Sequence, residues 1–198
     1  MSIASSLFNI TLSGRIFLIQ PVNTTGAVIL NEAVLHILPE LLQAGIQVVH
    51  QTGRENYEDI IKVLQENGIA TEGGGYVPRD FFSASELADV LALASVVLSR
   101  AGAGSISELA ALKKAVILAP LASAANDEQR LNAYDIAKIG GAIVLEEPNL
   151  REHILLEKIT ELMADADLRA AMGERMNQFH HPDAALAIAN GLRTLMKR

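Results

Sequence analysis

Short apolar segments alternate along the chain with longer segments in which apolar residues recur every three or four positions. The first kind is typical of strands buried in a parallel sheet, and the second of helices with one buried face. The apolar segments predict strands at 15–20, 46–50, 69–77, 96–98, 115–119 and 142–145. The periodic segments predict helices at 27–42, 57–67, 86–94, 106–112, 128–138, 150–164, 167–177 and 184–197.

This alternation predicts an α/β fold, a doubly wound parallel sheet with helices on both faces, followed by a C-terminal helical tail. No linker or low-complexity segment divides the pattern, so we expect one domain at 15–198, preceded by an N-terminal extension at 1–14. Three glycines, 73–75, weaken the third predicted strand. His180-His181-Pro182 is interpreted as a turn between the last two helices, because no further ligand lies at helical spacing from the histidines.

Composition narrows the class of protein. The chain has 198 residues, 50% of them hydrophobic, which suits one domain with a sizeable core. The formal net charge is −7 and no basic cluster is present, so a nucleic acid is not an expected partner. The absence of cysteine excludes disulfides and thiolate metal sites and is compatible with a cytoplasmic location. No apolar run approaches the roughly 18 residues that span a bilayer, and no signal peptide is recognisable.

The stretch from Ser99 to Leu112, S-R-A-G-A-G-S-I-S-E-L-A-A-L, follows a predicted strand and leads into a predicted helix. Gly102 and Gly104 predict a tight turn whose backbone can approach a ligand closely, and Ser105 is a candidate helix cap. The unpaired N–H groups at such a helix start favour an anion such as phosphate. Glu108, one turn further on, is placed to accept hydrogen bonds from sugar hydroxyls. The alternative is a structural turn followed by a solvated glutamate.

Three motifs together resemble one family. They are H-Q-T-G from His50 to Gly53, S-R-A-G-A-G-S-I-S-E-L from Ser99 to Leu109, and A-N-D-E-Q-R-L-N-A from Ala125 to Ala133. In this order and spacing they are similar to the donor-binding half of the MurG-like glycosyltransferases of the GT-B fold. Those enzymes add N-acetylglucosamine to the lipid-linked muramyl-pentapeptide precursor of peptidoglycan. The resemblance implies a Rossmann-like, UDP-sugar-binding domain that extends from about Arg15 to the C-terminus.

The resemblance also implies roles for individual residues. Glu108 matches the glutamate that accepts hydrogen bonds from both ribose hydroxyls of UDP. The helix-start segment that faces the sugar and phosphates is matched by Gly102, Ala103, Gly104 and Ser105. Arg100 matches an arginine that pairs with phosphate or braces the loops. Gln129 matches a glutamine that binds the hydroxyls of N-acetylglucosamine. Asn132 lies one turn later on the same helix face, and its alternative role is a hydrogen bond to a neighbouring loop. Thr52 and Gly53 match a loop that touches phosphate.

The chain departs from the family pattern at three places. The family's first glycine-rich loop, G-G-S-x-G-A, is replaced here by V-N-T-T-G-A at 22–27, so Thr25 and Gly26 are the candidate binding residues there. Glu128 replaces the histidine of the family's D-H-Q motif. Lys113-Lys114-Ala115 stands where the family has Gly-x-Pro. Because β-branched threonines resist the positive φ that glycine permits, the first change predicts a weaker phosphate contact.

The resemblance places the acceptor site and the general base in an N-terminal domain, for which 198 residues leave no room. We therefore expect no catalytic residue in this chain, UDP-GlcNAc as its ligand, and neither a metal nor another cofactor. Its expected partner is an N-terminal acceptor domain or a separate acceptor subunit, as in eukaryotic split N-acetylglucosaminyltransferases. Membrane contact, at the inner face of the cell membrane, would come only through that partner.

Several alternatives remain open on the sequence alone. One alternative is a non-catalytic scaffold that kept the fold and lost donor binding. Another is an NAD-binding domain, suggested by the partial G-x-G motif at 102–104. His50 ends an apolar strand and is interpreted as a hydrogen-bonded structural residue rather than a base. The acidic pair Glu146-Glu147 is interpreted as a solvated strand exit.

Overall fold

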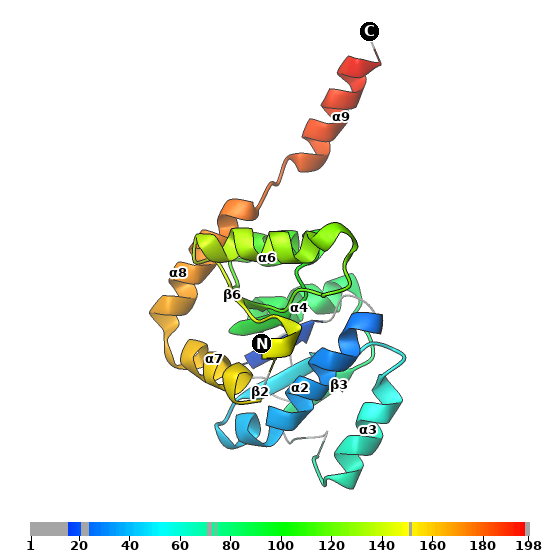
Figure 1. Ribbon diagram of the computed structural model, residues 1–198, viewed down its shortest axis with the longest axis vertical. Coiled ribbons are helices and arrows are strands. Elements are labelled where there is room, and N and C mark those ends of the chain that lie inside the picture. Colours follow the sequence, from blue (N-terminus) through cyan, green and yellow to red (C-terminus); the bar gives the residue numbers. More distant parts are fainter. Residues whose placement is uncertain (1–15, 21–23, 71–72, 74, 151, 197–198) are drawn as a thin grey trace.

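The computed structural model describes residues 16–20, 24–70, 73, 75–150 and 152–196. They form a six-stranded parallel sheet in the order β3-β2-β1-β4-β5-β6, with helices on both faces (Figure 1). The strands are β1 (Ile16–Gln20), β2 (Gln47–Gln51), β3 (Tyr76–Arg79), β4 (Val96–Ser99), β5 (Ala115–Leu118) and β6 (Ile143–Val144). This arrangement confirms the predicted doubly wound α/β fold.

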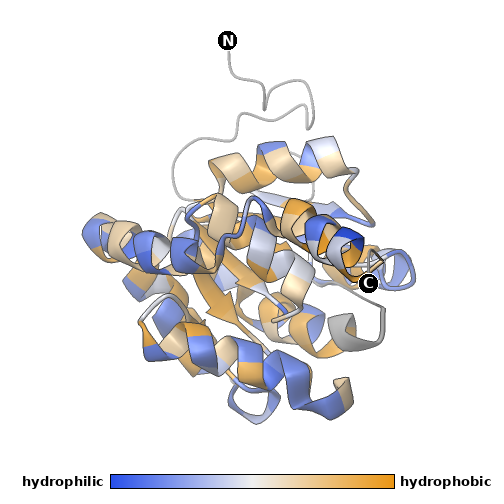
Figure 2. Cartoon of the chain, turned by 90° about the horizontal axis from the view of Figure 1, so that it is seen from above, coloured by the Kyte–Doolittle hydropathy of each residue, from blue (hydrophilic) through white to orange (hydrophobic). Residues whose placement is uncertain are grey.

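Two cores form because successive strand side chains point to opposite faces of the sheet. In β1, Phe17 and Ile19 belong to one core, and Ile16 and Leu18 to the other. The first core is covered by α2 (Thr24–Gln43), α3 (Tyr57–Glu66) and α7 (Glu152–Ala164). The second is covered by α4 (Ala84–Leu93), α5 (Ala103–Ala111) and α6 (Glu128–Lys138). In Figure 2 the largely hydrophobic strands lie between helices of mixed character, as a sheet buried on both faces requires.

Several predicted boundaries were wrong, including two, near β1 and β3, that differ by three residues or more. The weak strand predicted at 69–77 begins only at Tyr76, because Gly73 and Gly75 adopt positive φ values of 72° and 85° just before it. The strand continues through Pro78, which an edge strand tolerates because it needs no second ladder partner. The helix predicted at 27–42 begins earlier, at Thr24, so residues 24–26 of the predicted turn are helical. The extension predicted at 1–14 and residues 21–23 lie outside the described residues.

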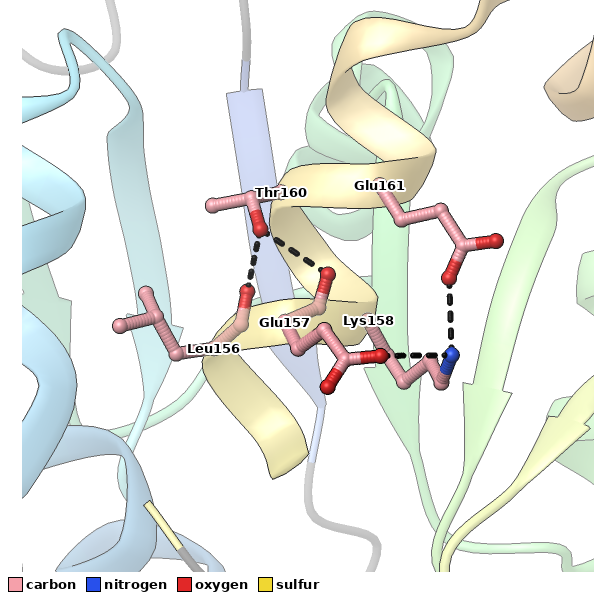
Figure 3. A network of polar contacts seen from close by, with 5 residues as sticks. All are labelled: Leu156, Glu157, Lys158, Thr160 and Glu161. Carbon is pink, nitrogen blue, oxygen red and sulfur yellow. Dashed lines mark hydrogen bonds and ion pairs between the residues drawn. The ribbon is translucent and has the colours of Figure 1, made fainter. Parts of the chain in front are cut away.

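The tail consists of α7, α8 (Ala166–Met176) and α9 (Ala184–Leu195), with short 3-10 turns at Glu147–Asn149 and Asn177–Phe179. One face of α7 packs into the first core, and its exposed side carries polar contacts (Figure 3). There Lys158 pairs with Glu157 at 3.1 Å and Glu161 at 2.9 Å, while Thr160 donates to two carbonyls of the preceding turn. The solvent-exposed helix α9 extends away from the domain (Figure 1). In the described part of the chain, no helix combines the length and apolarity needed to cross a membrane.

Helix α8 bridges the two cores, with Met172 in the first and Met176 in the second. It approaches the turn before β5 so closely that a Cβ added at Gly173 would lie 2.0 Å from the carbonyl oxygen of Lys113. Lys113 itself has a φ of 51°, in the region that favours glycine. The glycine that the family pattern has near this position is therefore explained by backbone conformation. Here a lysine takes that conformation, and its Nζ pairs with Glu174 at 2.8 Å.

Candidate functional site

The order of the strands defines where a ligand would bind. β1 and β4 are neighbours at the centre of the sheet, and the chain leaves them toward opposite faces, through α2 and α5. In open α/β sheets a crevice forms at the carboxyl ends of two such strands. On the β4 side, the loop at this crevice contains Arg100, Ala101 and Gly102. On the β1 side, Thr25 and Gly26 lie in the first turn of α2.

Gly102 is the N-cap of α5, with φ −71° and ψ 145°, and Ala103, Gly104 and Ser105 are the first three helical residues. Ser105 was therefore wrongly predicted as the cap, and it is buried in the first turn. Gly102 and Gly104 do not have positive φ values, so the backbone here does not require glycine. What the glycines provide is room, because a Cβ at either position would have no neighbour within 4 Å. The N–H groups of the first turn thus lie at an edge without protruding side chains.

Glu108 lies in the second turn of α5 and is exposed. It is four residues beyond Gly104, so the two residues share one face of the helix. The first turns of both α5 and α2, the helices that start at the crevice, contain no acidic residue. The first turns of α3, α4 and α6 each contain one or two. The positive ends of the crevice helices are therefore not neutralised by carboxylates of their own first turns.

Arg100 is almost fully buried beneath the crevice. Its Nη1 donates to the carbonyls of Ala119 and Pro120 at 3.0 and 3.3 Å, and its Nη2 pairs with Glu147 at 2.8 Å. Burial lowers the pKa of Arg100, and the neighbouring carboxylate opposes that shift. Of the two roles considered for Arg100, these contacts are those of a residue that braces loops. The prediction that Glu147 is a solvated strand exit was wrong, because its carboxylate turns inward to this guanidinium.

Gln129 and Asn132 lie on α6 and connect it to two loops of the crevice. The Oε1 of Gln129 accepts a hydrogen bond from the backbone N–H of Leu121 at 3.1 Å, and the Nδ2 of Asn132 donates to the carbonyl of Ala101 at 3.2 Å. The second bond is the loop contact considered as an alternative for Asn132. A pocket of about 260 Å³ between α5 and α6 is lined by Ala103 and Asn132, among others.

Thr52 and Gly53 form the exit loop of β2. Thr52 is fully buried, and its Oγ1 donates to the carbonyl of Arg79 at 3.1 Å, so the hydroxyl faces the protein. Gly53 has a φ of 84°, a conformation that favours glycine. The Thr52 carbonyl accepts hydrogen bonds from the Nδ2 atoms of Asn31 and Asn56, at 3.0 and 3.1 Å.

His50 was correctly predicted to be structural. It is fully buried, and its ring nitrogens lie 2.8 Å from the Tyr76 hydroxyl and 2.8 Å from Asn31 Oδ1. Burial lowers the pKa of His50 to about 3 and raises that of Tyr76. A histidine that is neutral and enclosed in this way does not serve as a general base near neutral pH.

Three features at this edge were missed by sequence reasoning. Asn31 is buried on the apolar face of α2. Its position three residues before Val34, which places it on the buried face of the helix, was the signal that the sequence offered. Glu147 as the partner of Arg100 had no local signal. Asn126 and Asp127 both adopt left-handed conformations, with φ of 54° and 57°, in the loop that leads into α6. Strained backbone of this kind is often found at ligand-binding loops.

In the ranges covered by the structure, no group of three or more histidine or acidic side chains is placed to hold a metal ion. The crevice instead combines backbone donors, two helix N-termini and an exposed carboxylate. Such a site suits an anion attached to a diol, and the strand order is that of a half of the Rossmann type. The chain belongs to glycosyltransferase family 28, because residues 22–188 match the model of that family's C-terminal domain.

Individual relatives agree with this assignment. The UDP-N-acetylglucosamine--N-acetylmuramyl-(pentapeptide) pyrophosphoryl-undecaprenol N-acetylglucosamine transferase of Nitratidesulfovibrio vulgaris (strain DP4) is 35% identical over 172 residues, which are 87% of this chain and 46% of that protein. The protein of the same name from Lachnospira eligens is 41% identical over 143 residues, covering 72% and 37%. The crystal structure of Acinetobacter baumannii MurG is similar with a TM-score of 0.75 and 25% identity, over 92% of this chain and 52% of that one. The chain thus spans about half the length of these relatives.

Proposed function

We propose that this chain binds UDP-N-acetylglucosamine at the carboxyl edge of its sheet and is the donor-binding half of an N-acetylglucosaminyltransferase. The observation that carries the proposal is the exposed Glu108, one turn behind the N-terminus of α5, at the switch point of a family 28 C-terminal domain. An anion held at Ala103 and a diol held at Glu108 are separated by about 7.5 Å along the helix axis. A nucleoside diphosphate carries both groups on one molecule.

In this proposal the diphosphate lies against the N–H groups of Ala103, Gly104 and Ser105, and the positive end of α5 stabilises its charge. Glu108 accepts hydrogen bonds from both ribose hydroxyls, since a carboxylate has acceptor sites on each oxygen. The sugar lies toward α6, where Gln129 and Asn132 meet the loops after β5 and β4. The donor needs no metal or further cofactor, because the helix end and backbone donors meet the leaving diphosphate.

The names of the relatives supply the sugar and the acceptor in this proposal: N-acetylglucosamine and a lipid-linked muramyl-pentapeptide. Because the chain matches about half of each relative, we assign the acceptor site and the general base to the other half. That half is either part of the same polypeptide or a separate subunit. It would bring this domain to the cytoplasmic face of the cell membrane, where the two halves would transfer the sugar with inversion.

A thermal-shift experiment tests the binding step. Millimolar UDP and UDP-GlcNAc should raise the melting temperature of the chain, whereas NADH should not. Glu108→Ala should abolish the shift, and because the side chain is exposed, the variant should fold like the wild type. Glu66→Ala is the matched control, since Glu66 is an exposed glutamate at the C-terminal end of α3. An unchanged melting temperature with both UDP ligands would favour the scaffold alternative, in which this face binds a protein.

A further inference from the structure

The buried polar residues behind the β2 exit loop form one continuous chain of hydrogen bonds. It runs from Tyr76 through His50 and Asn31 to the carbonyl of Thr52, with separations of 2.8, 2.8 and 3.0 Å. The three side chains come from β3, β2 and α2, and all three residues are buried. These hydrogen bonds therefore link three neighbouring elements to a single peptide group of the loop.

The direction of each bond follows from the Thr52 end. A carbonyl oxygen only accepts, so Asn31 must present its amide nitrogen to Thr52 and its Oδ1 to His50. His50 then carries a proton on Nε2 and donates it to Asn31 Oδ1. Because burial lowers the pKa of His50 to about 3, the ring is neutral near neutral pH, and its Nδ1 therefore accepts from the Tyr76 hydroxyl.

Fixing the Thr52 carbonyl also fixes the N–H of Gly53. The two groups belong to one planar trans peptide and point in opposite directions. Asn31 and Asn56 hold the carbonyl toward the protein. The N–H of Gly53 consequently points away from these two side chains, at the carboxyl end of β2.

We infer that Asn31 is a positioning residue for nucleotide binding, which aims the N–H of Gly53 at a phosphate of the ligand. The inference rests on the proposed function. Asn31 lies on α2, whose N-terminus is at the same crevice, and it therefore couples the β2 exit loop to that helix. A peptide N–H held in place in this way loses no orientational freedom when the phosphate binds.

Nuclear magnetic resonance titrations of the 21.2 kDa chain test the inference, with UDP and uridine as ligands. Saturating UDP should shift the Gly53 amide resonance strongly, and uridine, which lacks phosphate, should not. Asn31→Ala should raise the Kd for UDP about tenfold or more, the effect of losing a hydrogen bond to a charged group, and leave the Kd for uridine unchanged. Tyr76→Phe is the matched control. It removes the hydrogen bond between Tyr76 and His50 without releasing the Thr52 carbonyl, so the Kd for UDP should stay within twofold of wild type.

The outcomes separate the inference from the proposed function. If wild-type protein binds UDP but its Gly53 amide is unaffected, the inference is overturned and the proposed function stands. The same holds if Asn31→Ala binds UDP like wild type, or loses UDP and uridine affinity equally. If the wild type binds neither ligand, the proposed function fails and the inference fails with it. The wild-type Gly53 measurement decides the matter even if Asn31→Ala does not fold.

Discussion

Burial of His50 should make the folding stability of this protein depend on pH in a way that one substitution can isolate. In the folded protein His50 is enclosed by Tyr76 and Asn31, and its pKa is lowered from the ordinary 6.5 to about 3. In the unfolded chain the same ring takes up a proton near pH 6.5. Between these two values the unfolded state binds more protons, so the free energy of unfolding decreases as the pH falls. Above pH 6.5 the stabilisation is fully present.

The magnitude follows from the width of this window. Each pH unit within it costs about 1.4 kcal/mol, so His50 alone should remove about 2 kcal/mol between pH 6.5 and pH 5. Urea denaturation followed by circular dichroism at pH 7, 6 and 5 measures this loss. His50→Gln is the reference, because glutamine does not titrate and all other ionisable groups are common to both proteins. The stability advantage of wild type over His50→Gln should shrink by about 2 kcal/mol from pH 7 to pH 5, and an advantage independent of pH would refute the reasoning.

Two further substitutions probe the packing around the site, each with a control. Glu147→Ala leaves a buried guanidinium without its carboxylate and should lower the free energy of unfolding by about 3 kcal/mol, whereas Glu157→Ala, which breaks an exposed pair, should cost less than about 1 kcal/mol. Gly173→Ala places a Cβ against a backbone carbonyl and should cost about 3 kcal/mol, whereas Gly191→Ala, with open space around it, should cost nothing. Equal effects within either pair, measured by urea denaturation, would contradict the packing described.

Much of the fold could be predicted from local patterns, because a strand buried on both faces must be apolar throughout. The segment 96–98 is an example, because it was predicted as a buried strand and forms β4, in the centre of the sheet. Boundaries failed where one conformational feature decided them. Strand β3 begins only after the glycines that precede Tyr76, and no periodicity indicates that point.

The site was predictable only in its outline. A strand, a glycine-containing turn and a helix from Ser99 onward could be predicted, since all three signals are adjacent in the sequence. The glycines were expected to let the backbone approach a ligand closely, and the structure agrees, because they leave space without adopting a positive φ. The partners that hold the loops were not predictable, because they come from distant segments. Arg100, which follows β4, meets Glu147, which follows β6, and His50 meets Asn31 from the preceding helix.

The proposed donor site is tested most directly by calorimetric titration of UDP-GlcNAc into the wild-type chain and into Glu108→Ala. The account predicts saturable binding to one site in wild type, and a Kd raised at least tenfold in the variant, because two hydrogen bonds to a charged acceptor are lost. Absence of heat up to millimolar ligand would contradict the central claim. Equal affinity of the two proteins would place the nucleotide elsewhere than at the N-terminus of α5.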